Sequence, residues 1–378
     1  MTNEAISPWS VPPAEWRGIC VEALGEKAFR GDQIVDALYR QFAASWGEVT
    51  TLSAALRQKL EARFPIRPLE QVALSDSGDG SVKLLLGCPA DGERIESVLI
   101  PSKGRLTQCI SSQVGCNFRC AFCASGLLGK KRNLTAGEIV GQVMAACRYL
   151  RAKAPDGPGV DERGRGKTEL PRPGNIVVMG MGEPFDNYDE VIRALRILND
   201  QKGLAIGARH ITISTCGVVP GIQRLAEEGL QFELSVSLHA PDNLLRDQLM
   251  PVNRMWPLEV LLPACKAYME KTGRIITFEY TLVRKFNDRP HHADRLIALL
   301  RNMPCKVNLI PLSPVEEFSG KRPDTADCKA FLDRLLQAKI NTTLRFSKGR
   351  DVNAACGQLR LNGLKSPGRA ERDPLAEG

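Results

Sequence analysis

Three cysteines could hold a metal centre. Cys116, Cys120 and Cys123 lie within eight residues, with the spacing C-x3-C-x2-C. Iron–sulfur clusters take cysteine thiolates as ligands, and a four-iron cluster with only three protein ligands leaves one iron open to a small chelating ligand. A zinc site is the alternative, and it would need a fourth ligand, usually Cys or His at CxxC or HxxxH spacing. No His lies near this segment. The spacing therefore favours an iron–sulfur cluster with one open iron.

The composition limits the kinds of protein this chain can be. Hydrophobic residues make up 43% and charged residues 25% of the sequence. Such values are typical of a folded soluble protein and exclude a wholly disordered or fibrous chain. The 51 lysines and arginines exceed the 43 aspartates and glutamates, which gives a formal net charge of +8. This excess favours an anionic partner.

The expected compartment follows from the first residues and from the cysteines. The opening MTNEAISPWS has neither the basic region nor the apolar region of a signal peptide. No apolar run approaches the roughly 20 residues that a membrane span needs. We therefore expect a cytoplasmic protein with no membrane association. There the 12 cysteines should be free, metal-bound or catalytic rather than structural disulfides.

Alternating strand-like and helix-like segments surround the cysteine motif. The strand-like runs are 105–113, 175–181, 210–217, 232–240, 274–283 and 305–311, and the helix-like segments are 135–151, 188–200, 219–229, 257–271, 289–302 and 325–338. Repeated βα units with right-handed crossovers predict a parallel sheet, and about six of them favour a partial TIM-like (βα)6 barrel of the α/β class. The cysteine motif follows the first of these strands, and barrel enzymes place their chemistry at such strand ends.

The first part of the chain has a different pattern. Residues 1–17 are expected to form a loose leader. Two helices should follow, one capped by Asp32 and one that begins after Thr51 and ends at Pro65. Their basic residues allow two interpretations, the solvated faces of a small bundle or an RNA-contacting surface. These residues are Arg30, Arg40, Arg57, Lys59 and Arg63.

The cysteine motif, read as C-x3-C-x-Phe-C, resembles that of the radical S-adenosylmethionine (SAM) superfamily. In that superfamily the cluster binds SAM through its amino and carboxylate groups, and one electron cleaves SAM to methionine and a 5′-deoxyadenosyl radical. A barrel shields the radical from water. The resemblance implies a [4Fe–4S] cluster on Cys116, Cys120 and Cys123, with SAM as the second cofactor.

Further motifs are similar to those of one family within that superfamily. Cys109 lies in TQCISSQVGC and Cys356 in DVNAACGQL, and the chain also has GMGEP at 180–184, SLHAP at 237–241 and CKVNLIP at 305–311. Together they resemble the RlmN/Cfr family of RNA adenine methyltransferases, from about Ala28 to Leu359. The resemblance implies RNA as the substrate, two SAM molecules per turnover and a flavodoxin-type electron donor. Nothing in the sequence suggests an obligate oligomer, so we expect a monomer.

The family chemistry implies a role for each cysteine outside the cluster motif. By resemblance, one SAM methylates Cys356, and the radical from a second SAM takes a hydrogen from that methyl group. The carbon adds to the adenine ring, and Glu96 in RIESVLIP is the implied proton acceptor. Cys109 then attacks the Cys356 sulfur, and the transient disulfide releases the methylated RNA. Without the resemblance, Cys109 and Cys356 would be interpreted as ordinary buried thiols and Glu96 as a solvent-facing strand glutamate.

SAM contacts are implied by the same resemblance. They are Gly182 and Glu183 in GMGEP, Ser214 in ITISTCG, Ser237, Leu238 and His239 in SLHAP, and Ser313 after NLIPL. At position 313 the family usually has asparagine. Serine offers a short hydroxyl where asparagine offers an amide.

The chain is expected to form two domains and a tail. Residues 1–72 should form a helical accessory domain that binds RNA. Residues 73–362 should form the radical SAM core with an added strand extension and the catalytic-cysteine loop, and residues 363–378 a disordered tail. The expected reaction is methylation of C2 of adenosine in 23S rRNA, and the sequence leaves open whether tRNA is a second substrate. Three alternatives stay open: Cfr-type methylation of C8, an RNA-binding protein with a structural iron–sulfur cluster, and a radical SAM enzyme with another substrate.

Overall fold

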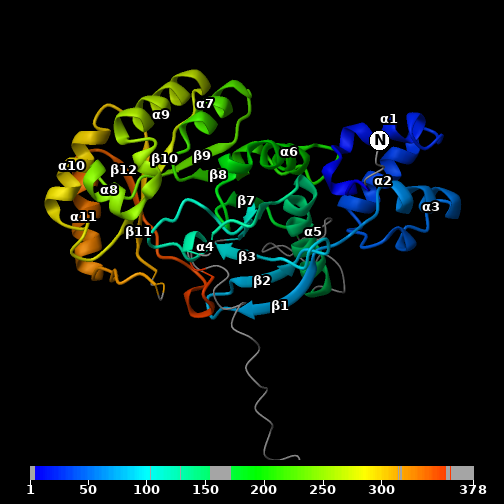
Figure 1. Ribbon diagram of the computed structural model, residues 1–378, viewed down its shortest axis with the longest axis horizontal. Helices are drawn as coiled ribbons and strands as arrows, with labels where there is room; N and C mark the ends of the chain where they lie inside the picture. The colour runs from blue at the N-terminus through cyan, green and yellow to red at the C-terminus, as the bar shows by residue number, and fades with distance from the viewer. Residues whose placement is uncertain are drawn as a thin grey trace, which may run out of the picture.

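The computed structural model describes residues 5–102, 104–127, 129–153, 172–313, 315, 317–354 and 358. Within these residues one sheet crosses the molecule (Figure 1). Its strands, in spatial order, are β1 (Glu70–Asp76), β2 (Val82–Gly87), β3 (Arg94–Ser102), β4 (Arg105–Cys109), β7 (Asn175–Val178), β8 (Ile211–Thr215), β9 (Glu233–Ser237), β10 (Thr277–Leu282), β11 (Lys306–Pro311) and β12 (Asn341–Leu344). A separate pair is formed by β5 (Gln113–Val114) and β6 (Arg132–Asn133).

In the large sheet, β4 and the strands from β7 to β12 are parallel and alternate with helices. The helices that connect them are α5 (Ala136–Lys153), α6 (Tyr188–Asn199), α7 (Val219–Glu227), α8 (Asn243–Leu249), α9 (Leu258–Thr272), α10 (Pro290–Leu300) and α11 (Thr325–Gln337). The predicted α/β class with a partial (βα)6 barrel is confirmed. Strands β1, β2 and β3 extend the sheet in antiparallel pairing beside β4.

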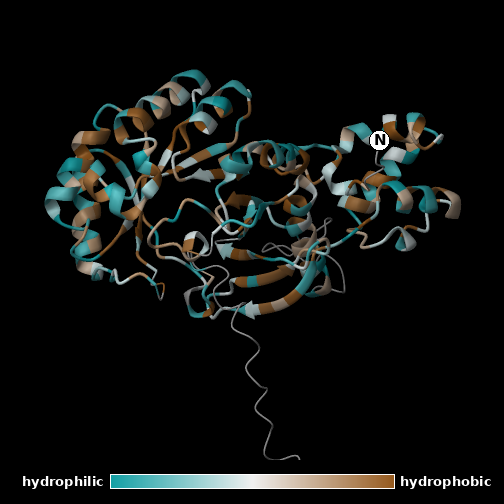
Figure 2. Cartoon of the chain, viewed as in Figure 1, coloured by the Kyte–Doolittle hydropathy of each residue, from teal (hydrophilic) through white to brown (hydrophobic). Residues whose placement is uncertain are grey.

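One face of the parallel sheet is apolar and lies against helices. Ile213, Val236 and Tyr280 are buried on this face, and the Tyr280 ring lies 5.4 Å from that of Phe331 in α11. Side chains alternate between the two faces of a strand, so every second residue shares this position. The helices carry both hydrophobic and hydrophilic residues along their lengths, as elements that cover a core must (Figure 2).

The opposite face of the same sheet is polar. Register pairs Ser214 with Ser235, and Ser237 with Glu279, on this inner face. A parallel sheet is normally apolar on both faces because both are covered. A polar inner face therefore indicates a lining for a ligand rather than for a packed core.

The first residues are not a loose leader, and that expectation is wrong for residues 5–17. Trp9 in η1 (Pro8–Ser10) and Trp16 at the start of α1 (Trp16–Glu22) are 1% and 0% exposed. Asp32 is not a helix cap either. Ala28 precedes α2 (Phe29–Tyr39) in the cap position, and Asp32 instead accepts hydrogen bonds from Arg17 at 2.8 and 2.6 Å. The first residues are ordered because the large apolar rings of the two tryptophans are buried. Asp32 does not cap the helix because it pairs with the charge of Arg17.

Other elements lie as the sequence predicted or were missed by it. The second predicted helix is α3 (Ala54–Arg63), capped by Ser53. Strand β1 starts at Glu70 and β12 is four residues long; neither was predicted, because both are polar and largely exposed. No helix in the described part of the chain is long and apolar enough to cross a membrane. Residues 154–171, Cys356 and the expected tail at 363–378 lie outside the described residues.

Candidate active site

The three cysteines of the motif line one cavity together with most of the expected SAM contacts. The cavity lies at the carboxyl ends of the parallel strands, as expected for a barrel enzyme. Among its lining residues are Cys116, Cys120, Cys123, Gly182, Glu183, Ser214, Ser237, His239, Glu279, Thr281 and Ser313. Leu238 does not line it. Leu238 is fully buried, and its N–H donates to the carbonyl of Glu279.

Backbone contacts fix the loop between β5 and β6 that bears Cys116, Cys120 and Cys123, here called the cluster loop. The N–H of Ala121 donates to the carbonyl of Leu249 at 2.9 Å, which ties the loop to the end of α8. Gly115 precedes the first cysteine with φ +78°, and a Cβ there would lie 1.8 Å from the carbonyl oxygen of Gly129. Only glycine combines this backbone conformation with so close an approach. The loop therefore has one well-defined path.

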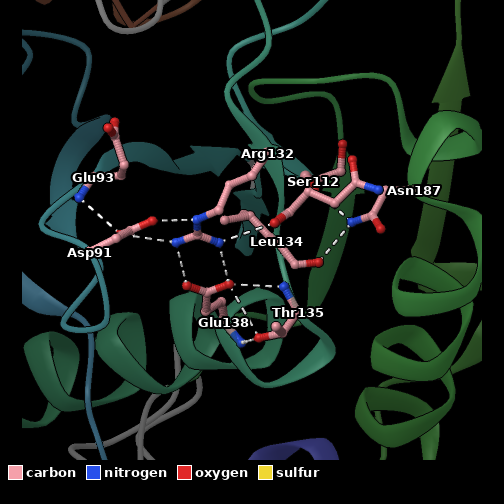
Figure 3. Close-up of polar contacts among 9 residues, drawn as sticks. Asp91, Glu93, Ser112, Arg132, Leu134, Thr135, Glu138 and Asn187 are labelled. Atoms are coloured by element: carbon pink, nitrogen blue, oxygen red, sulfur yellow. Dashed lines mark hydrogen bonds and ion pairs between the residues drawn. The ribbon is translucent and has the colours of Figure 1, made fainter.

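A polar network supports the β5–β6 pair, whose strands flank the cluster loop in the sequence (Figure 3). Arg132 in β6 donates to Asp91 at 2.5 Å and to both carboxylate oxygens of Glu138 at 2.8 and 2.9 Å. These bonds to carboxylates raise the pKa of Arg132, with Glu138 the largest cause. Asn187 donates to the carbonyl of Leu134 at 2.8 Å. Charge-assisted, bidentate bonds of this kind hold geometry well.

Burial dominates the electrostatics of the three thiols. It raises the pKa of Cys116 to about 12, raises that of Cys120 well above its usual value and raises that of Cys123. A cysteine binds a metal as the thiolate, not as the thiol. The positive charge of a bound metal centre would therefore have to drive loss of the thiol protons from these three cysteines.

The GMGEP segment is held by its own backbone and by the acid. Glu183 is 3% exposed, and its carboxylate accepts hydrogen bonds from the N–H groups of Phe185 at 3.0 Å and Cys216 at 2.7 Å. Burial raises the pKa of Glu183. Gly182 has φ +101°, and a Cβ there would lie 2.6 Å from Cβ of Gln113. The segment thus joins the end of β7 to that of β8 across the cavity.

His239 and Ser313 line the same cavity but differ in their hydrogen bonding. Nδ1 of His239 accepts the N–H of Thr281 at 2.9 Å, and its ring meets that of Phe122 edge-on at 4.8 Å. Burial lowers the pKa of His239 to about 3, so the imidazole is neutral near pH 7. Ser313 is 6% exposed, and its hydroxyl has no hydrogen-bond partner among the described residues. A buried hydroxyl left in this state suits a ligand contact.

Glu96 and Cys109 share the inner face of the sheet. Val98 of β3 pairs with Cys109 of β4, and Glu96 lies two residues before Val98 on the same face. Glu96 is 1% exposed, so the interpretation as a solvent-facing glutamate is wrong. Its carboxylate lies 3.4 Å from Nζ of Lys83. Cys109 is 7% exposed, whereas Cys356 lies outside the described residues.

Comparison with known proteins decides the family. Residues 161–297 match the family model described as the radical SAM superfamily, and residues 19–66 match that of the ribosomal RNA large subunit methyltransferase N-terminal domain. Two proteins described as "probable dual-specificity RNA methyltransferase RlmN" are similar over most of their length. The protein from Enterococcus faecalis is 46% identical over 91% of this chain and 93% of its own. The protein from Streptococcus suis is 45% identical over 93% and 92%. The chain belongs to the RlmN family.

A solved structure agrees with this assignment. The crystal structure of a radical SAM methyltransferase from Sphaerobacter thermophilus is 42% identical, has a TM-score of 0.86 and covers 94% of this chain and 99% of its own. The chain is a radical SAM RNA methyltransferase, and its family uses a [4Fe–4S] cluster and SAM. When bound, these cofactors supply a 5′-deoxyadenosyl radical.

The residues of this RlmN-family chain fit both cofactors. Within the described ranges, no three His, Cys, Asp or Glu side chains lie close enough together to hold a single metal ion. Cys116, Cys120 and Cys123 instead surround a shared cavity, which suits a multinuclear cluster whose irons bind separate thiolates. The hydroxyl of Ser313, which has no partner in the described part of the chain, and the backbone of the GMGEP segment leave polar groups for SAM.

Sequence reasoning missed two buried charged residues of the RlmN-family site. Glu279 lines the cavity, and Ser214 donates to its carboxylate at 3.2 Å. Arg246 is 0% exposed and donates to the carbonyls of Cys216, Ser237 and Leu238. A glutamate in the strand-like run TFEYTL was a usable signal, since a charge there must face a ligand or a partner. Arg246 had no comparable signal, because an arginine on a short helix is usually exposed.

Proposed function

We propose that this RlmN-family enzyme methylates C2 of adenosine in 23S rRNA and in tRNA through an S-methylcysteine at Cys356. The observation that carries the proposal is the shared inner face of the sheet. Register places Glu96 and Cys109 on the face that also bears the cavity residues Ser214 and Glu279. The relatives whose printed names read dual-specificity RNA methyltransferase support the two RNA classes.

Three side chains of the protein have separate roles in the proposed reaction. Cys356 accepts a methyl group. Before the methyl carbon bonds to C2 of the adenine, one of its hydrogen atoms would pass to the 5′-deoxyadenosyl radical that the bound cofactors supply, and the odd electron left on the adduct would return to the cofactor centre. Glu96 takes the proton from C2, and its buried carboxylate lies 3.4 Å from Nζ of Lys83. The thiolate of Cys109 then attacks the sulfur of Cys356, and the sulfur–carbon bond breaks with its electron pair on the carbon. That carbon takes a proton, and the methylated base leaves. The resulting disulfide returns to two thiols with two electrons from an external reductant.

The partners belong to the same proposal. A flavodoxin-type protein supplies electrons, the enzyme acts as a cytoplasmic monomer, and residues 1–72 contact RNA. The net charge of +8 supports an anionic substrate. The five basic residues expected on the first helices have local partners; for example, Lys59 donates to the carbonyl of Leu24 and Arg57 to that of Gly47. Arginine has five N–H donors and lysine three, so a side chain with one local hydrogen bond can contact phosphate only through its remaining donors.

Nucleoside mass spectrometry of separated rRNA and tRNA tests the proposal. A host that lacks adenine-carbon methylases would express the chain, its Cys356→Ala variant, or the Cys328→Ala variant, which changes a buried cysteine of α11. We expect 2-methyladenosine with the unchanged chain and with Cys328→Ala, and none with Cys356→Ala, because the methyl carrier is gone. The appearance of 8-methyladenosine instead would show Cfr-type chemistry. Methylation that persists in Cys356→Ala would overturn the mechanism.

A further inference from the structure

The segment that leads to Cys356 lies against the turn between β1 and β2. Asp351 accepts hydrogen bonds from the Ser77 hydroxyl at 2.5 Å and from the N–H of Gly78 at 2.9 Å. In return, Asp79 accepts the N–H of Gly349 at 2.8 Å. Each side thus offers a carboxylate to backbone or hydroxyl donors of the other, although the two lie about 270 residues apart in sequence. Carboxylates that accept such bonds are held more firmly than neutral acceptors are.

Two lysines extend this contact along the strands. Nζ of Lys348 donates to the carbonyl of Pro101 at the end of β3. Nζ of Lys83 in β2 lies 3.5 Å from the carbonyl of Asn353 and 3.4 Å from the Glu96 carboxylate. The Lys83–Glu96 pair is buried, with side chains 7% and 2% exposed. A buried ion pair adds little net stability, because desolvation offsets its attraction, so such a pair is weak evidence of a stabilising role.

The turn residues are shaped for this contact. Asp79 accepts the N–H of Ser81 at 2.9 Å as well as that of Gly349, and these bonds keep the pKa of Asp79 low, at about 2, against the opposing effect of burial. Gly349 has φ +67°, and a Cβ there would lie 2.8 Å from Cβ of Ala354. The N–H of Ala354 donates to the carbonyl of Gly349 at 2.8 Å. The segment is therefore a closed turn seated on the β1–β2 hairpin.

We propose that the β1–β2 turn is a dock that positions the Cys356 segment for methyl transfer, and that Lys83 links this dock to Glu96. The dock is defined as Ser77, Gly78, Asp79 and Lys83 on one side and residues 348–354 on the other. This inference rests on the proposed function, since it gives the added strands a role in presenting the methyl carrier. Asp79, Asp351 and Lys83 are positioning residues, because none of them lines the cavity of the cluster cysteines.

The test separates docking from folding and from cofactor loading. Asp351→Ala removes both acceptors from one side of the dock, and Asp79→Ala removes the acceptor from the other. Asp76→Ala is the matched control, because Asp76 is an exposed aspartate of β1. For each protein, peptide mass spectrometry measures the methylated fraction of Cys356, iron analysis measures the cluster and 5′-deoxyadenosine formation measures SAM cleavage. Hydrogen exchange of residues 345–358 measures docking directly.

We expect Asp351→Ala and Asp79→Ala to slow methylation of Cys356 by about ten-fold and to speed exchange of the segment, because each loses charge-assisted hydrogen bonds. Iron content and SAM cleavage should stay at the level of Asp76→Ala. Equal Cys356 methylation in all four proteins would overturn the positioning role. If the unchanged chain carries no methyl group on Cys356, the proposed function fails, and the dock is then judged by exchange alone. Unchanged exchange in Asp351→Ala would refute it.

Discussion

In the proposed reaction the cluster loop and the segment before Cys356 act together, yet the protein holds them in different ways. The cluster loop is held by buried backbone bonds, such as that from Ala121 to Leu249, and by glycines that permit one path. The Cys356 segment is held mostly by side-chain contacts, chiefly those of the carboxylates of the exposed residues Asp79 and Asp351, with further contacts from the ammonium groups of Lys348 and Lys83. Exposed polar contacts exchange readily with water, whereas buried backbone bonds open only at a large cost.

This difference matches what each region has to do in the proposed reaction. The cluster ligands must keep one geometry through every turnover. Cys356 must meet a methyl donor, then an adenine and then Cys109, so its segment has to release and return. A fixed loop and a detachable segment are what those two tasks require, and their contacts can be broken separately.

The largest effect should follow from a change at the fixed loop. Cys120→Ala removes one of the three thiolates that surround the cavity, and we expect loss of the cluster and of SAM cleavage, because a two-thiolate site holds the cluster poorly. Iron analysis, the visible absorption spectrum and 5′-deoxyadenosine formation measure this loss. Cys328→Ala serves as the control. A Cys120→Ala protein with full iron content would show that the three cysteines are not the ligands.

A smaller but still large effect should come from the support of that loop. Arg246→Met removes a buried cation that donates to the carbonyls of Cys216, Ser237 and Leu238 and to Asn253. Several buried acceptors would lose their donor, so we expect the free energy of unfolding to fall by about 3 kcal/mol. Urea unfolding followed by circular dichroism measures it.

Arg246→Met and Asp351→Ala should also affect the two regions differently. Helix α8 bears both Arg246 and Leu249, the acceptor for the cluster loop, so SAM affinity should fall along with stability. Asp351→Ala, in contrast, should leave the unfolding midpoint unchanged. If Arg246→Met unfolds at the same urea concentration as the unchanged chain, the cluster loop is not supported in this way.

Much of the fold could be predicted because its signals are local. Apolar runs of strand length alternate with helical periodicity, and the bounds of α5, α6, α9 and α11 lie within a few residues of the expected segments. The errors arose where tertiary contacts override local pattern. The tryptophans near the start of the chain are buried against other elements, and Asp32 is engaged by Arg17 rather than by the start of a helix.

The candidate site divides in the same manner. The cluster cysteines and the GMGEP and SLHAP segments are short motifs, and the structure brings them to one cavity. No local sequence pattern predicts the ion pair of Lys83 with Glu96, because it joins two different strands. The same holds for the contacts of Asp351 with the β1–β2 turn, which join residues far apart in the chain. One sequence shows which residues can do chemistry; only the fold shows which of them meet.

The smallest effect concerns pH, and it should separate the two regions. Burial lowers the pKa of His239 from 6.5 to about 3, so the unfolded chain binds a proton that the folded chain excludes between these values. Stability should therefore fall by up to about 2 kcal/mol from pH 7 to pH 5. His239→Asn should flatten this slope, since asparagine tolerates φ +56° and can accept the N–H of Thr281.

The dock should not weaken over this range, because the pKa values of Asp79 and Asp351 are lowered and their contribution is lost only near pH 4 and below. Urea unfolding and hydrogen exchange at both pH values measure the two regions; equal slopes for His239→Asn and the unchanged chain would remove His239 as the cause.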